Sequence, residues 1–128
     1  MRAIGRAATV IALALLAACG GYGSDIDTVK KAETTPGTTN EAWANDIAGA
    51  RGHVEWSASK APAYNNNDVV EVVAHIDRPS AGGGGHKIEL HFIHNRQNEK
   101  VALDNVVLDG KPQGVLAGAL NLLLLQLQ

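Results

Sequence analysis

The sequence predicts an α+β domain in which a four-stranded antiparallel sheet carries N-terminal helices and a C-terminal helix packed on one face. Apolar residues first recur with helical spacing, up to about residue 50. They then alternate with polar residues as far as residue 108, which is typical of half-buried strands. The last segment, 114–128, is rich in leucine and again favours a helix.

Two short helices are expected before the sheet. The first, 24–33, begins with Ser24, a residue type that often caps helices, and carries a narrow apolar stripe. The second, 40–50, follows a Pro-Gly turn and has apolar residues at positions i, i+4 and i+7. Thr38 and Glu41 have the spacing of a capping box at its start.

Four strands are expected after these helices, because polar and glycine-rich segments separate stretches of alternating residues. The last strand is expected to contain a β-bulge, since its apolar residues change parity between Leu103 and Val106. The expected strands are residues 53–59, 69–77, 87–95 and 101–108.

The second and third strands are expected to form a hairpin whose register follows from charge. If Asp77 lies opposite Lys87, then His75 lies opposite Glu89, and both pairs are favourable across neighbouring strands. The opposite face then pairs Ile76 with Ile88 and Ala74 with Leu90. The agreement between the two faces supports this register.

The C-terminal helix contains seven leucines and no charged residue. Five leucines form one stripe that suits the core, whereas Leu122 and Leu125 fall outside it. We therefore expect either a helix that packs on the sheet and frays at its end, or one whose Leu122 and Leu125 contact a partner or a membrane. The segment is too short to span a bilayer, which takes about 20 residues. The stripe consists of Leu116, Leu120, Leu123, Leu124 and Leu127.

The N-terminus has the layout of a secretory signal, with two arginines before an apolar run that is shorter than the roughly 20 residues of a membrane span. The run ends in Leu16-Ala17-Ala18-Cys19, which resembles the lipobox of bacterial lipoproteins. The resemblance implies a diacylglycerol on Cys19, cleavage before it and stable anchoring to a membrane. Gly20 after the cysteine resembles the pattern of lipoproteins sent to the outer membrane.

These features divide the chain into a lipoprotein signal peptide at 1–18, a lipidated glycine-rich tether at 19–24 and a single domain at 25–128. The expected location is the bacterial cell envelope, in the outer membrane, with the domain facing the periplasm or the surface. The alternative is an ordinary secretory signal, which would leave Cys19 as a free thiol in an oxidising compartment.

The mature part carries Trp56, the run Val69-Val70-Glu71, a Lys-Ile-x-Leu-x-Phe strand at 87–92 and Asp-Gly-Lys-Pro-Gln at 109–113. This pattern is similar to an uncharacterised small domain of bacterial secreted and membrane-tethered proteins. The resemblance implies an α+β fold and brings no known activity.

Residues with obvious chemistry are sparse. The single cysteine excludes an internal disulfide and a thiolate zinc cluster, and a net charge of -2 argues against a nucleic-acid partner. His75, Glu89 and His91 share the outer face of the expected sheet and are weak metal-ligand candidates, although an exposed polar face with cross-strand pairs explains them better. Because the sequence has no nucleophile elbow and no phosphate-binding loop, we expect no catalytic residue and no cofactor.

The sequence therefore predicts a membrane-anchored, non-catalytic binding or assembly module of the envelope. Its partner would be an envelope protein or a second copy of the chain. Tyr64, an aromatic residue in a polar loop, is a further candidate contact beside Leu122 and Leu125. The alternatives are an inhibitor of an envelope or foreign hydrolase, and a surface metal-binding protein.

Overall fold

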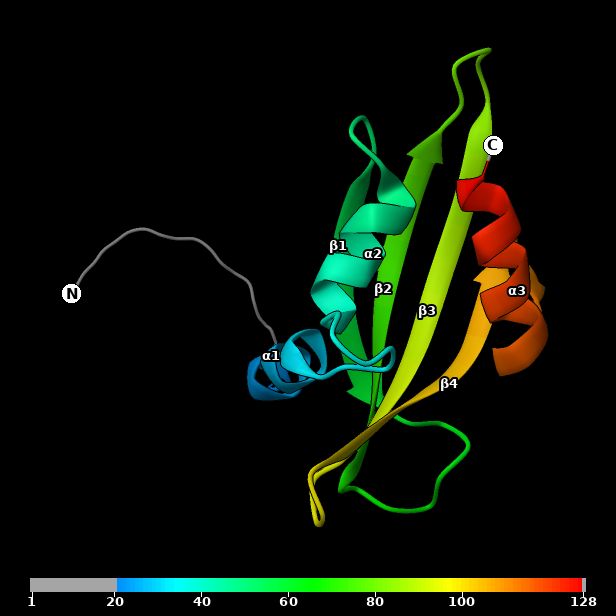
Figure 1. The fold of residues 1–128 in the computed structure, drawn as a ribbon. Coiled ribbons are helices and arrows are strands. Elements are labelled where there is room, and N and C mark those ends of the chain that lie inside the picture. The colour runs from blue at the N-terminus through cyan, green and yellow to red at the C-terminus, as the bar shows by residue number, and fades with distance from the viewer. Residues whose placement is uncertain (1–20, 128) are drawn as a thin grey trace.

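The computed structural model describes residues 21–127, so the predicted signal peptide, the lipobox and Cys19 lie outside the described residues. Two helices precede a meander of strands, and a third helix follows it (Figure 1). None of the helices within 21–127 has both the length and the apolar character that a bilayer span demands. The helices are α1 (Gly23–Lys31), α2 (Asn40–Ala48) and α3 (Val115–Gln126), and the strands are β1 (His53–Lys60), β2 (Val69–Pro79), β3 (Gly85–Asn95), β4 (Lys100–Leu108) and β5 (Lys111–Pro112).

The predicted α+β class is confirmed, but the antiparallel sheet has five strands rather than four. Each strand pairs with the next one along the chain, in the order β1 to β5. The additional strand, β5, is two residues long and turns back onto β4 through Asp109 and Gly110, both with positive φ. A two-residue strand leaves no alternating pattern in the sequence, which explains why it was not expected.

The predicted register of the central hairpin is confirmed. Asp77 lies opposite Lys87, and His75 lies opposite Glu89. The expected β-bulge in the fourth strand is also present. His91 of β3 pairs with Asn105 of β4, whereas Phe92 pairs with Leu103, two positions earlier in β4, so that Asp104 is the extra residue.

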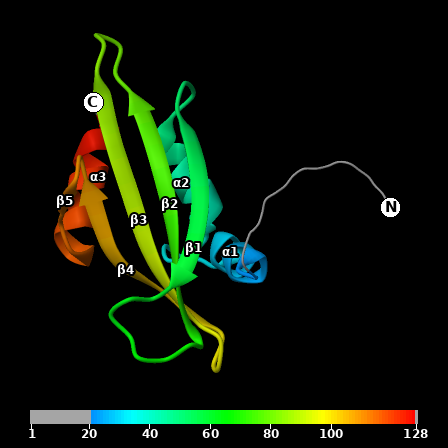
Figure 2. The ribbon, with the colours of Figure 1, turned by 180° about the vertical axis from the view of Figure 1, so that it is seen from behind.

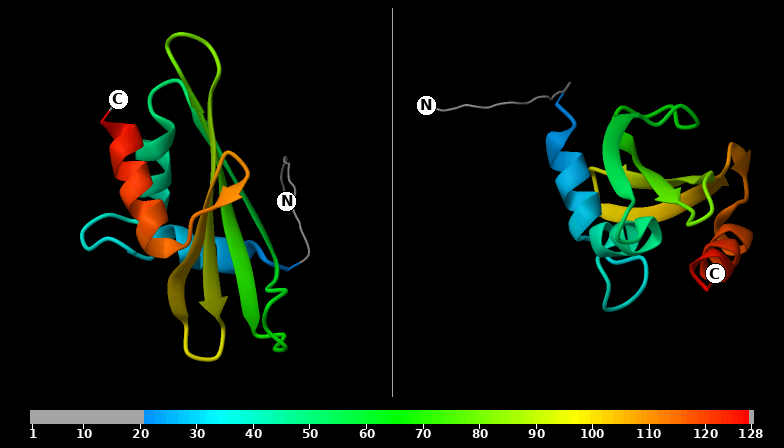
Figure 3. Two further views of the ribbon diagram at one scale, coloured as in Figure 1. Left: turned by 90° about the vertical axis from the view of Figure 1, so that its right-hand side faces the viewer. Right: turned by 90° about the horizontal axis from the view of Figure 1, so that it is seen from above.

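One face of the sheet forms the core with the helices. Figure 3 shows α2 and α3 on the same side of the strands. The indole of Trp56 stacks on Phe92 with ring centroids 6.2 Å apart, which closes the core toward β1. The buried core side chains are Val29, Ala44, Ile47, Ala48, Val70, Val72, Ala74, Ile76, Ile88, Leu90, Phe92, Val106, Leu122 and Leu125.

The helix starts differ in detail from expectation. Thr39, rather than Thr38, caps α2, because its hydroxyl oxygen accepts a hydrogen bond from the backbone N–H of Ala42. In the first helix, Ser24 lies inside the first turn and no side chain caps the end. Both helices still occupy the expected stretches of chain.

The orientation of α3 is the reverse of the expected one. Leu122 is 1% exposed and Leu125 is 5% exposed, and both pack in the core. The expectation that these two leucines meet a partner is therefore wrong. The deciding residue is Gly118, since a Cβ atom placed there would overlap the side chain of Val106 on β4. The helix approaches the sheet through this glycine, and Leu122 and Leu125 flank it one and two turns further on.

Replacing Gly118 with alanine tests this close approach. Alanine for glycine inside a helix ordinarily stabilises by about 1 kcal/mol. Here the new methyl group meets Val106, so we expect Gly118→Ala to lower the free energy of unfolding by about 1–3 kcal/mol. Urea denaturation measures the change, and Ala119→Gly on the exposed side of α3 calibrates the helix propensity. A rise in stability for Gly118→Ala would show that the helix does not pack this closely.

Candidate functional site

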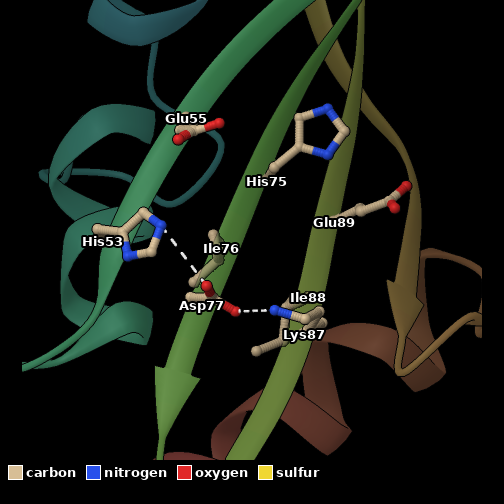
Figure 4. A pocket seen from close by; sticks show the side chains of 8 residues that line it. All are labelled: His53, Glu55, His75, Ile76, Asp77, Lys87, Ile88 and Glu89. Atoms are coloured by element: carbon tan, nitrogen blue, oxygen red, sulfur yellow. Dashed lines mark hydrogen bonds and ion pairs between the residues drawn. The ribbon is translucent and has the colours of Figure 1, made fainter.

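Within the described residues, no helix covers the face of the sheet away from α2 and α3, as Figure 2 shows from behind. A shallow depression crosses β1, β2 and β3 on this face (Figure 4). Asp77 accepts a hydrogen bond from Lys87 Nζ and lies 3.5 Å from His53 Nε2. The hydrogen bond from Lys87 is the main reason why the pKa of Asp77 is below its ordinary value. The depression is lined by His53, Glu55, His75, Ile76, Asp77, Lys87, Ile88 and Glu89.

The three metal-ligand candidates on this face have other partners. His75 Nε2 lies 2.9 Å from the hydroxyl of Ser57. The His91 ring lies between two carboxylates, with Nε2 2.7 Å from Glu89 and Nδ1 3.3 Å from Glu71. Within residues 21–127, no group of three or more His, Cys, Asp or Glu side chains is arranged to hold a metal ion. His75 thus pairs across strands with Ser57, and His91 pairs across strands with Glu71 and along its own strand with Glu89.

Tyr64 lies in the loop between β1 and β2, and its side chain is 42% exposed. Its backbone N–H donates to the carbonyl oxygen of Ala61, which closes a turn at the start of the loop. The ring is accessible to a partner, but no other large apolar side chain of the described residues in this loop is exposed with it. Tyr64 remains an isolated candidate contact.

A buried ionic cluster that was not predicted from the sequence joins the first helix to the end of β3. Asp25 and His94 are 2% and 3% exposed, although they are 69 positions apart in the chain. His94 Nδ1 lies 2.7 Å from one carboxylate oxygen of Asp25, and Arg96 donates from Nε and Nη2 to the two oxygens at 3.0 and 2.6 Å. Such a two-pronged arginine–carboxylate pair is among the strongest arrangements for a charged hydrogen bond.

The protonation of Asp25 follows from these contacts. Burial alone would raise the pKa of this carboxyl, but the hydrogen bonds from Arg96 and His94 outweigh it and hold the pKa below its ordinary value. Asp25 is therefore ionised at neutral pH. Arg96 also lies over the ring of Tyr22, with the guanidinium carbon 5.7 Å from the centroid. These contacts fix α1, the first described helix, to the sheet.

This cluster holds α1 against the sheet. Asp25 and His94 have almost no exposed surface, whereas Arg96 and Glu99, which contact them, are exposed. The alternation along β3 indicates that His94 faces inward, as Leu90 and Phe92 do. Because a buried histidine needs a polar partner, the sequence could have predicted that such a partner exists. The partner itself, on a distant helix, could not be read from the sequence.

The most unusual surface is on α3. Five leucines that were expected in the core instead point to solvent, with exposed fractions from 55% to 86%. No residue between Gly114 and Gln128 carries a charge. Both the buried and the exposed side of this helix are therefore apolar, whereas a helix on the surface of a monomer ordinarily has a polar outer side. We define the leucine surface as Leu116, Leu120, Leu123, Leu124 and Leu127.

The sequence matches no family model, and neither a curated protein nor a solved structure is significantly similar to it.

Removing the charge of Asp25 tests the buried cluster. Asp25→Asn is expected to lower the free energy of unfolding at pH 7 by about 3 kcal/mol, because it removes the buried carboxylate that pairs with His94 and with both donating groups of Arg96. Asp27→Asn, an equal loss of charge at an exposed position of the same helix, serves as the control and should change stability little.

The pH dependence of stability provides a second measurement on the same variants. Since the folded-state pKa of Asp25 is lowered, its contribution is complete above about pH 4 and is lost as the pH falls through the folded-state value. Stability of the unmodified chain should therefore fall more steeply below pH 4 than that of Asp25→Asn. Equal acid slopes in denaturant titrations would contradict this role for Asp25.

Proposed function

We propose that this protein is a lipid-anchored bacterial envelope protein that acts as a non-catalytic binding or assembly module. The observation that carries the proposal is the leucine surface, since soluble monomers rarely expose contiguous apolar patches of more than a few hundred Å². A domain that retains such a surface after folding is suited to bind another molecule through it.

The proposed anchor is a lipid on Cys19, close to the folded domain. The first helix begins at Gly23, four positions later. A stretch of four residues spans at most about 14 Å in any conformation. Because the Asp25 cluster fixes this helix to the sheet, the whole domain would stay near the membrane surface. Partners within the same membrane, or attached to it, are then the ones most readily reached.

A binding role agrees with the chemistry of the described residues better than an enzymatic one. The depression on the open sheet face is shallow, and its lysine is already paired with Asp77. The buried His94 is enclosed with Asp25 and Arg96. The leucine surface offers area and apolar character, which support binding, and no group for acid–base or nucleophilic chemistry.

Replacing the lipobox cysteine tests the anchor. Cys19→Ser is expected to abolish incorporation of a labelled fatty acid and to release the protein from the membrane fraction, because serine cannot carry the thioether lipid. Labelling followed by membrane fractionation measures both effects. Ser24→Ala, a change outside the lipobox, should leave labelling and fractionation unaltered. Membrane association that survives Cys19→Ser would mean that a lipid on this residue is not the anchor.

A further inference from the structure

We propose that the leucine surface of α3 binds the same surface of a second copy of this chain, so that the protein forms a symmetric dimer on its membrane. This inference rests on the proposed binding function and names the partner. A twofold axis through the middle of the helix would bring each leucine surface against its own equivalent, which is the arrangement of most homodimers.

The size of the surface suits a dimer. The five leucines of this surface, 55% to 86% exposed, present on the order of a few hundred Å² of apolar area on one side of the helix, which is the patch size that often marks a binding site on a monomer. Face-to-face contact would remove up to about twice that area from water, close to the lower limit of roughly 1,200 Å² for specific interfaces. Contacts from neighbouring side chains at the rim would add to this area.

The spacing of the leucines suits a helix as the binding partner. Leu116, Leu120, Leu123 and Leu127 follow one another at intervals of four, three and four residues, which is the spacing of a coiled-coil seam. All four point away from the buried side that contains Gly118 and Leu122. In an antiparallel pair, Leu116 would meet Leu127 of the second copy, and Leu120 would meet its Leu123.

The absence of charge favours a second copy over a lipid surface. Helices that lie on membranes ordinarily carry lysine or arginine beside their apolar face, and often an aromatic residue. The segment from Gly114 to Gln128 contains none of these. Its Asn121 is already used within the chain, since Nδ2 donates to the side-chain oxygen of Gln113 at 2.7 Å. An uncharged, self-complementary surface therefore matches another α3 best.

Cysteine crosslinking in the native envelope tests the dimer. The chain has a single cysteine, Cys19, which the proposed lipid occupies, so that an introduced thiol reports on its own position. Leu120→Cys in the full-length lipidated protein, treated with a short bismaleimide, should give a crosslinked species of twice the monomer mass. Ala102→Cys, at an exposed position on β4, is the matched control and should give little crosslinking.

Charges introduced at the two ends of the leucine surface provide a second test of the dimer. Leu116 and Leu127 are the most exposed leucines, so Leu116→Lys with Leu127→Lys should leave the fold and its urea midpoint unchanged. Added to Leu120→Cys, these lysines should lower the crosslinked dimer more than about tenfold, because apolar contacts do not pair buried charges. Ser59→Lys with Ala102→Lys, on the open sheet face, adds the same charge and should preserve the dimer.

Each other outcome overturns the dimer in a distinguishable way. Crosslinking of Leu120→Cys to a different protein alone would leave the proposed binding function intact. A thiol at 120 that crosslinks nothing, but is shielded from a water-soluble maleimide, would indicate lipid as the occupant of the surface. A thiol that crosslinks nothing and reacts freely would show an uncovered surface, and would remove the support for the proposed function as well.

Discussion

The register of the β2–β3 hairpin determines which side chains face the helices and which face solvent. It places Ala74 and Leu90 opposite each other on the covered face, and His75 and Glu89 opposite each other on the open face. A shift by one residue would move every apolar side chain of one strand to the open face. The helices, Trp56 and the inward His94 all take their positions from this alignment. The same alignment could be predicted from the sequence, because charge and apolar pattern agree on both faces.

The orientation of α3 could not be predicted in the same way. Leucines occur on all sides of this helix, so periodicity predicts that the larger stripe faces the core and that Leu122 and Leu125 lie outside it. In the structure Leu122 and Leu125 are buried instead, because Gly118 lies on the same side of the helix and allows close approach to Val106. One side of α3 therefore packs in the core, and the other side stays apolar and exposed. The leucines that were predicted for the core are the ones that form the surface available for binding.

The buried Asp25 cluster marks another limit of sequence reasoning. An aspartate near the start of a helix, such as Asp25, is explained by its favourable interaction with the helix dipole. An arginine in a turn, such as Arg96, is ordinarily explained by exposure to solvent. Only folding brings them together with His94. Burial of ionic groups is costly unless they are fully paired, so this cluster specifies how α1 packs rather than adding much net stability. It attaches the first helix to the sheet at the end of the domain that lies next to the proposed lipid anchor.

On the proposed arrangement, one side of α3 packs in the core and the other side packs against a second chain. Hydrogen exchange of the lipidated protein in detergent, measured over a range of protein concentrations, distinguishes a paired α3 from an uncovered one. We predict that protection of the α3 amides rises with concentration, while that of the β2–β3 hairpin stays constant, because association stabilises only the helix at the interface. Protection of α3 that is independent of concentration, in a protein that remains monomeric, would contradict this arrangement.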